Sequence, residues 1–451
     1  MNKIAWEKYQ KSTKEVFDFA EGYRVFLGRA KNERNVIKES VKLLKKDGYK
    51  DLDSLTSLKG VTKVYAVNKG KSLFAIHLGK NFMDGGLNIL GAHIDSPRLD
   101  LKPVPLYEKG QFALLDTHYY GGVKKYQWTT IPLSLVGLIV KKDGTKVDVN
   151  LGEDEGDPVL GIGDLLIHLS ADQMGKPLAR AIEGEKLDVT IGSIPAKGKV
   201  KDNVLSILKK KYNIEEDDFL SAEIEVVPNM KPCNYGIDNS MIAGYGHDDR
   251  CCAYPSLIAL LDEEKISKSG VVILTDKEEV GSHGATGAFS KFFEYSLIKL
   301  MKLKGIKEPN AYLAEVLSNS NMLSSDVSAG SDPLYSSVDS PNGNQARIGY
   351  GLTINKYTGS RGKSSSNDAN AEFLAKVRNI FDSNDVSWQI SELGAVDAGG
   401  GGTIAFILAE YNINVIDAGI AVLNMHAPME VISKVDLFEA YKGYKAFLKD
   451  A

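Results

Sequence analysis

The stretch LNILGAHID, residues 87–95, carries an apolar run into His93 and Asp95 and decides the fold class. The apolar run predicts a buried strand that ends at His93. Two runs of the same kind follow, GVVILTD at residues 270–276 and NINVIDAGI at residues 412–420. Helical patterns lie between these runs, and strands that alternate with helices predict an α/β layered domain.

Helical periodicity is strongest at the two ends of the chain. In about the first 45 residues, apolar side chains recur at spacings near 3.6 with charged residues between them. These apolar residues are Val16, Phe17, Ala20, Tyr23 and Phe26. Residues 252–264 (CAYPSLIALLDEE) and residues 433–450 (SKVDLFEAYKGYKAFLKD) are also predicted helices. We expect Ser433 and Asp436 to form a box-like cap at the start of the last helix.

The middle of the chain has a different pattern. Residues 101–232 consist of short strand-like runs, glycine-rich turns and charged loops, which predict a mostly-β insertion. Its most polar part, KDNVLSILKKKYNIEEDDF at residues 201–219, is expected to include an exposed helix. The α/β domain is therefore predicted in two pieces, residues 1–100 and 233–451.

Length and charge limit the classes of function. The chain has 451 residues with 55 basic and 59 acidic side chains, and about 100–200 residues per domain favours two or three domains. The near balance of charge indicates neither nucleic acid nor a membrane as a partner. The longest apolar run, residues 131–140, is shorter than the about 20 residues that a bilayer core needs, so it is predicted to be a buried strand.

The three cysteines point to a reducing compartment. They are Cys233, Cys251 and Cys252, and an odd, low number in a long chain argues against a disulfide framework. We interpret them as packing residues. The N-terminus has no uninterrupted apolar stretch after its basic residues, so no signal peptide is expected and the predicted location is the cytoplasm.

Polar side chains gather where the predicted strands end. An imidazole at His93 can bind a metal ion through one nitrogen, while Asp95 holds the other N–H; the alternative is a surface pair. Asp248 and Asp249 lie just before a predicted helix, where carboxylates also serve as helix caps. In open α/β sheets, functional groups collect at the carboxyl ends of the strands, which favours the metal-binding interpretation.

Three further segments add carboxylates and a histidine. Glu278 and Glu279 follow an apolar strand, so one can bind a metal while the other faces a substrate water; a solvated loop is the alternative. Asp326 follows an apolar stretch, and His426 lies in AVLNMHAPMEV, where a packed histidine is the alternative. Together with His93, these residues predict a two-metal pocket. Histidine and carboxylate ligands suit zinc, with manganese or cobalt as substitutes.

Six motifs in order resemble those of the M18 family of metallo-aminopeptidases (aspartyl aminopeptidase-like). They are GAHIDSPRLDLKP, LDTHYYGGVKKYQW, GHDDR, DKEEVGS, SSDVSAG and NMHAPME, and the resemblance extends from about Asn88 to Glu430. It implies a three-layer α/β/α metallopeptidase domain with an inserted mostly-β dimerisation domain. It also implies a homo-oligomer, in which dimers assemble into a dodecamer.

The same resemblance implies roles for the residues. Asp249 would bridge two divalent ions, with Asp248 as its neighbour or in exchanged order, and the Asp249–Arg250 peptide bond is expected to be cis. Glu278 would act as the general base, and Asp95 would orient an imidazole. The implied metal ligands are His93, Asp249, Glu279, Asp326 and His426.

Substrate contacts are implied less directly. His168, in GDLLIHLS, would be offered to the pocket of a neighbouring subunit; a strand-face histidine is the alternative. Lys356 and Arg361 would hold an acidic substrate side chain, or lie on a surface loop. Gly401, in the run of residues 399–402, would allow close approach of the substrate, or form a tight loop before a helix.

The implied activity is removal of the N-terminal residue from peptides that have a free α-amine. GHDDR and GLTINKYTGSRGKSSSND depart from the eukaryotic pattern, which leaves an acidic or a neutral first residue open. The competing hypotheses are a related two-metal amidohydrolase or carboxypeptidase, and a non-catalytic assembly or cargo-binding protein with this fold. Motifs of serine hydrolases, zincins and P-loop enzymes are absent from the sequence.

Overall fold

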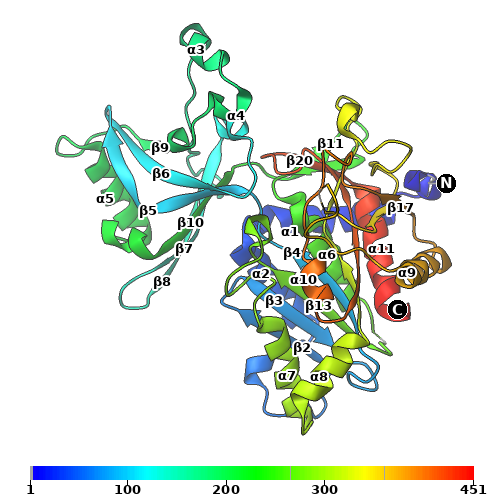
Figure 1. The fold of residues 1–451 in the computed structure, drawn as a ribbon. Coiled ribbons are helices and arrows are strands. Elements are labelled where there is room, and N and C mark those ends of the chain that lie inside the picture. The colour runs from blue at the N-terminus through cyan, green and yellow to red at the C-terminus, as the bar shows by residue number, and fades with distance from the viewer. Residues whose placement is uncertain (1–3, 265, 360) are drawn as a thin grey trace. The chain divides into compact units, whose positions relative to one another are not determined.

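A computed structural model describes residues 4–264, 266–359 and 361–451, and the chain forms two compact units (Figure 1). The first unit comprises residues 1–95, 232–425 and 430–451. The second unit comprises residues 96–231 and 426–429. Each unit has its own sheets and helices, which confirms the predicted α/β class.

A nine-stranded sheet is the centre of the first unit. In spatial order its strands are β1 (Lys50–Asp51), β2 (Lys63–Asn68), β3 (Ser72–His77), β13 (Ser269–Thr275), β4 (Leu87–His93), β14 (Asn321–Ser324), β18 (Asn414–Gly419), β16 (Leu352–Asn355) and β17 (Trp388–Ser391). The four strands β13, β4, β14 and β18 are parallel neighbours. Their carboxyl ends therefore meet at one edge of the sheet, where functional groups of open α/β sheets collect.

Side chains alternate between the two faces of this sheet, and each face has its own core. On β13, Val272 and Leu274 pack in one core, and Val271 and Ile273 pack in the other. The first core is covered by α1 (Lys14–Arg29), α2 (Glu33–Lys46), α6 (His247–Leu261), α9 (Ala371–Ser383) and α11 (Lys434–Asp450). The second core is covered by α7 (Phe292–Lys304), α8 (Pro309–Ser318) and α10 (Ala405–Ala409). This period-two burial with helices on both faces makes a three-layer α/β/α sandwich.

The terminal helices follow the predicted periodicity. Val16, Ala20, Tyr23 and Phe26 on α1 are buried, as the spacing near 3.6 requires. Among the described residues, no helix combines the length and the apolar character that crossing a bilayer demands.

The predicted capping box at the start of α11 is wrong. Ser433 is the N-cap residue, but its side chain makes no capping hydrogen bond. The carboxylate of Asp436 instead accepts hydrogen bonds from the backbone N–H groups of Gly349, at 2.7 Å, and Gly351, at 2.6 Å. The carboxylate that would accept a hydrogen bond in a local cap thus accepts hydrogen bonds from a chain segment about 85 residues away in sequence.

A five-stranded sheet completes the first unit. Its spatial order is β11 (Cys233–Tyr235), β12 (Met241–Gly244), β20 (Glu430–Ser433), β19 (Ala421–Leu423) and β15 (Ser328–Ala329). Strand β12 leads into the start of α6, and β15 begins two residues after Asp326. This sheet therefore holds chain segments next to two of the predicted metal ligands.

The second unit is built on a six-stranded antiparallel sheet. Its order is β8 (Lys146–Leu151), β7 (Leu133–Val140), β10 (Ala222–Pro228), β5 (Arg98–Lys109), β6 (Phe112–Tyr120) and β9 (Val189–Gly192). The apolar run at residues 131–140 forms β7, a largely buried strand as predicted. The predicted exposed helix is α5 (Val200–Tyr212), which packs against β5, β6 and β9.

Short elements connect these parts of the chain. The remaining α-helices are α3 (Ala171–Met174) and α4 (Leu178–Ala181), both in the second unit. The 3-10 helices are η1 (Ala5–Tyr9), η2 (Leu52–Ser54), η3 (Lys125–Trp128), η4 (Ile167–Leu169), η5 (Gly184–Lys186), η6 (Glu216–Ser221), η7 (Glu278–Val280) and η8 (Ser336–Val338).

Candidate metal centre

Three neighbouring parallel strands deliver polar side chains to one place. His93 is the last residue of β4 and is paired in register with Thr275, the last residue of β13. On the other side of β4, Ser324 at the end of β14 is paired with Gly91. The loops that carry Glu278, Glu279 and Asp326 therefore begin beside His93.

The imidazole of His93 is almost fully buried, with 2% exposure. Its Nδ1 atom lies 3.1 Å from the backbone carbonyl oxygen of Asp95 and 3.4 Å from its carboxylate. Its Nε2 atom lies 3.0 Å from Oδ1 of Asp248 and 4.0 Å from Oε2 of Glu278. With Nδ1–H donating to Asp95, the Nε2 lone pair faces the carboxylates, which is the arrangement of a metal-binding histidine.

Asp95 also fixes the segment that follows β13. Its two carboxylate oxygens accept hydrogen bonds from the backbone N–H groups of Glu278, at 3.1 Å, and Glu279, at 3.2 Å. Lys277, just before η7, has a left-handed backbone with φ of 69°, so the chain turns sharply there. Asp95 thereby orients the imidazole chiefly through its carbonyl oxygen and the two glutamates through its carboxylate.

The start of α6 contributes two aspartates with non-helical backbone angles. The cis peptide bond lies between Asp248 and Asp249, so the prediction of a cis bond at Asp249–Arg250 is wrong by one residue. The two aspartates are chemically identical, and only their tertiary contacts distinguish them. The N–H of Asp248 donates to Oε2 of Glu430 at 3.1 Å, and Oδ2 of Asp249 accepts from the N–H of His93 at 3.3 Å.

These side chains form two overlapping groups that can hold a metal ion. One group is His93, Asp249 and Asp326, and the other is His93, Asp248 and Glu279. Within each group, the potential ligand atoms all lie within 4.8 Å of one another. An imidazole combined with carboxylates is a donor set that zinc accepts.

The electrostatics of the cluster fit a bound cation. Burial raises the pKa of Asp249 well above its usual value, and the neighbouring Cys252 and Asp326 raise it further. Burial likewise raises the pKa of Asp326; the nearby His93 opposes this shift, whereas Glu278 and Asp248 add to it. The buried Oδ1 atom of Asp249 has no hydrogen-bond partner among the described residues. A divalent ion would supply both the missing partner and the missing positive charge.

The pKa of His93 responds to the same negative charge. Burial lowers this pKa, but hydrogen bonds to Asp248 and Asp95 outweigh burial, so that the pKa is raised well above its usual value. In the protein without metal, a proton on the imidazole would therefore take the place that a cation is suited to fill.

A third group, Asp249 with Cys251 and Cys252, is less suited to a metal. Both thiols are buried in α6, and burial raises the pKa of Cys251 to about 11. A thiol binds metal as the thiolate, which this environment disfavours. The packing role predicted for the three cysteines agrees with this environment for Cys251 and Cys252, but it is wrong for Cys233, which is exposed on β11.

Asp417 is a residue of the site region that sequence reasoning missed. It lies near the end of β18, and burial raises its pKa to about 6. Its Oδ1 accepts a hydrogen bond from Oγ1 of Thr403 at 2.7 Å, so it ties the glycine run before Thr403 to the sheet. Asp417 is close enough to raise the pKa of Asp326. Its position after the apolar run NINVI is the same signal that singled out His93.

Two predicted site residues belong to the second unit. His426 lies in the segment 426–429, where its Nδ1 is 3.1 Å from the carbonyl oxygen of Gly122 and its backbone φ is 67°. His168 lies in η4, not on a strand face, and its side chain is exposed. The role of His426 as a metal ligand and the catalytic role of His168 stay predictions.

The predicted substrate contacts lie in the first unit. Nζ of Lys356 forms an ion pair with Oδ1 of Asp368 at 2.9 Å, so its charge is already engaged. The N–H of Gly401 donates to the carbonyl oxygen of Thr358 at 3.0 Å. Apart from its chain neighbours, no atom of the described residues lies within 4 Å of where a Cβ of residue 401 would be.

A family model, related sequences and solved structures all identify the same family. The family model described as "Aminopeptidase I zinc metalloprotease (M18)" matches residues 26–448. The probable M18 family aminopeptidase 1 of Clostridium acetobutylicum is 52% identical over 458 residues, covering 99% of this chain and 98% of that protein. The M18 aminopeptidase structure from Thermotoga maritima has a TM-score of 0.96 at 44% identity and covers 100% of both chains. The aminopeptidase I structure from Clostridium acetobutylicum has a TM-score of 0.92 at 50% identity and covers 99% of both chains.

Replacing Gly419 by alanine should weaken metal binding without unfolding the protein. A Cβ at this position would lie 1.8 Å from the backbone oxygen of Asp326, so the segment that carries Asp326 must shift. When a residue that positions a metal ligand is displaced, the metal affinity falls by about 10–100-fold. Competition with a chromophoric chelator measures the affinity of Gly419→Ala.

Gly163→Ala is the control, because within the described ranges no atom other than those of its chain neighbours lies within 4 Å of its Cβ position, and its φ is not left-handed. Its metal affinity should equal that of the unmodified protein. Equal affinity in the folded Gly419→Ala variant would show that the Asp326 segment does not hold the metal.

Proposed function

The chain belongs to the M18 family of zinc metallopeptidases, which makes it a metallo-aminopeptidase, and on that premise we propose a two-metal centre around His93. Two divalent ions, with zinc as the first choice, would be held there for removal of the N-terminal residue from peptides. The observation that carries this proposal is the pair of overlapping ligand groups that share His93. The Nε2 atom of His93 can bind only one ion, and the four carboxylates of the two groups together with this imidazole exceed the four ligands of a single zinc ion.

The shared ligand is assigned to Asp248, which exchanges the order expected from the sequence. The carboxylate of Asp248 faces Nε2 of His93 at 3.0 Å, belongs to the same group as Glu279, and is close enough to raise the pKa of Asp326. It is thus near the ligands of both groups. Asp249 instead accepts a hydrogen bond from the backbone of His93. In this assignment Asp326 and Glu279 complete the ligands that the first unit supplies, and His426 stays a predicted further ligand.

Single substitutions separate the two aspartates. Asp248→Ala should lose both ions, whereas Asp249→Ala should keep about one ion or more per chain, because only a shared ligand serves both metals. Elemental analysis of the purified variants gives the metal content. If Asp249→Ala lost both ions and Asp248→Ala retained metal, the shared ligand would be Asp249, as the sequence predicted.

The general base is assigned to Glu278. A bound divalent metal would polarise the scissile carbonyl group and lower the pKa of water. Glu278 belongs to neither of the two His93-centred ligand groups found among the described residues, yet its Oε2 lies 4.0 Å from Nε2 of His93. Its carboxylate takes the proton from the attacking water and passes it to the leaving amine. The substrate's free α-amine is held by a carboxylate of the pocket, which restricts cleavage to chain ends.

Glu278→Gln should retain the metal and lose turnover. The amide has nearly the same shape but cannot accept the proton, and loss of general-base catalysis lowers kcat by about 10²–10⁴-fold. The measurement is steady-state hydrolysis of amino-acid anilides alongside metal content. Glu410→Gln, an exposed glutamate at the end of α10, is the matched control with unchanged turnover. A fully active Glu278→Gln enzyme would refute the assignment of the base.

We also propose that the chain forms a homo-oligomer, with dimers that assemble into a dodecamer, through surfaces that include the segment around His168. The four neighbours Leu165, Leu166, Ile167 and Leu169 are 54–70% exposed. Contiguous apolar patches of this kind mark interaction surfaces. In such an assembly, His168 is offered to the active site of a neighbouring subunit.

His168→Ala should lower kcat while metal content stays unchanged, since the residue is no metal ligand in this proposal. His118→Ala is the control, as His118 is also exposed in the second unit. The decisive measurement is co-expression of His168→Ala with Glu278→Gln. Activity above that of either variant alone would indicate an active site that is shared between subunits. An unchanged rate in His168→Ala would show that His168 takes no part in catalysis.

For the substrate, we propose a neutral first residue in preference to an acidic one. Lys356 and Lys363 both pair with the carboxylate of Asp368, at 2.9 and 2.8 Å. Two lysines that share one carboxylate are less available to bind an acidic substrate side chain. The cytoplasm is the proposed location, since Cys233, Cys251 and Cys252 are all free thiols.

A further inference from the structure

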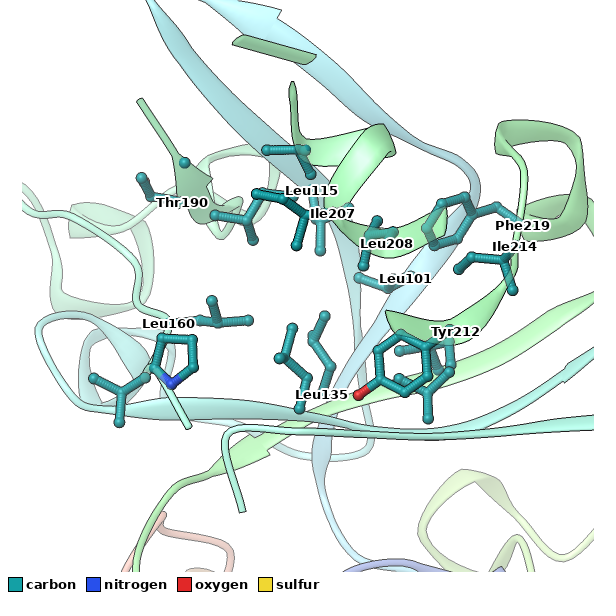
Figure 2. A pocket seen from close by; sticks show the side chains of 18 of the residues that line it. Leu101, Leu115, Leu135, Leu160, Thr190, Ile207, Leu208, Tyr212, Ile214 and Phe219 are labelled. Atoms are coloured by element: carbon teal, nitrogen blue, oxygen red, sulfur yellow. The ribbon is translucent and has the colours of Figure 1, made fainter. Parts of the chain in front are cut away.

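The second unit contains an apolar cavity of about 390 Å³ between its sheet and α5 (Figure 2). It is lined by strand residues such as Leu101, Leu115 and Leu135 and by Ile207 and Leu208 of α5. The segment that includes Leu160 closes a further side. The cavity therefore has walls from several elements of one unit and is more than an exposed sheet face.

The cavity opens to solvent through apolar side chains. Ile207 and Val159 line it and are each 55% exposed, and Phe112 lines it and is 49% exposed. Of the apolar residues on α5, only Val200 and Val204 are fully buried. Protein atoms therefore leave part of the apolar side of α5 uncovered, which is unusual for a helix that lies on a sheet.

The lining decides the chemical class of the occupant. Among the described residues that line the cavity, none carries a charge at neutral pH. Tyr212 has the one phenolic hydroxyl there, and it donates to the carbonyl oxygen of Asn150 at 2.7 Å. Thr190 and Ser193 add aliphatic hydroxyls. An ion would lose its hydration in this cavity without gaining a partner, so the occupant is uncharged.

The backbone around the cavity argues against a protein segment as occupant. Strand β7 is paired with β8 on one side and β10 on the other, and β5 is paired with β10 and β6. These interior strands have no open edge to which a peptide could add, although the edge strands β8 and β9 also line the cavity. A buried peptide would also need partners for its own N–H and C=O groups, and the mostly apolar side chains of the lining supply few. A volume of about 390 Å³ lies within the range of about 300–1,000 Å³ that is typical of small-molecule pockets.

We propose that this cavity is a binding site for a small, uncharged, predominantly aliphatic or aromatic molecule. Apolar cavities in proteins remain dry and bind such molecules because burial of apolar surface drives the association. All lining residues belong to the second unit, so binding does not depend on the metal centre.

Titration of the full chain with N-phenyl-1-naphthylamine, a neutral apolar fluorophore, tests the proposal. We expect saturable binding of about one probe per chain with enhanced, blue-shifted emission, unchanged by EDTA. Decanol should displace the probe, and decylammonium should not, because the two differ only in the charged end. Absence of saturable binding, or equal displacement by both competitors, would overturn the proposal.

Two variants at the mouth of the cavity locate the binding site. Ile207→Trp and Val159→Trp, which change two exposed lining residues far apart in sequence, should each weaken probe binding by about tenfold or more, since the indole fills the mouth. Val104→Trp is the control, because Val104 is 68% exposed on β5 and does not line the cavity. Unchanged affinity in both variants would overturn the proposal, as would a change in oligomeric mass, which would make the cavity an interface between copies of the chain.

Discussion

Buried negative charge around one imidazole is the constraint on which the first unit depends. Four carboxylates form two overlapping groups with His93, in each of which the potential ligand atoms lie within 4.8 Å of one another. These residues are Asp248, Asp249, Glu279 and Asp326. Burial and mutual repulsion raise the pKa of Asp249 and Asp326, so the carboxylate forms are disfavoured unless positive charge is added. A chain that folds to this arrangement is stabilised by whatever cation it binds, because binding to the folded state alone shifts the folding equilibrium.

The scaffold meets this constraint with backbone geometry. Three parallel strands in register bring His93 and the loops with Glu279 and Asp326 to the same edge. Gly419 of β18 lets the backbone at Asp326 approach so closely that a methyl group would not fit. His93 lies on a strand, and the loops with Glu279 and Asp326 begin at strand ends, so the sheet positions the start of each segment that carries a ligand.

The sequence predicted the parts of the fold that local patterns encode. Apolar runs marked β4, β13 and β18, and the spacing of Val16 and Ala20 marked α1, because strand and helix periods are properties of neighbouring residues. The order of Asp248 and Asp249 could not be predicted, since only contacts with His93 and Glu430 distinguish them.

Two other features escaped local reasoning for the same cause. Asp436 matched a capping pattern, yet the structure uses it to bind a loop from elsewhere in the chain. The cavity of the second unit arises where α5 leaves part of the sheet uncovered, and no residue spacing reports on unfilled volume. Local sequence patterns thus predict which helices and strands form. The contacts of their polar and apolar side chains depend on the tertiary structure.

The two adjacent glutamates show how one contact can separate two chemical roles. Asp95 accepts hydrogen bonds from the N–H groups of both Glu278 and Glu279, so the short turn η7 is held at two points. Neighbouring side chains on such a turn point in different directions, and only Glu279 belongs to a His93-centred ligand group among the described residues. Because the carbonyl oxygen of Asp95 also lies 3.1 Å from Nδ1 of His93, a shift of this residue would move His93, Glu279 and Glu278 together. The proposed division of labour therefore depends less on the identity of the two glutamates than on the buried aspartate behind them.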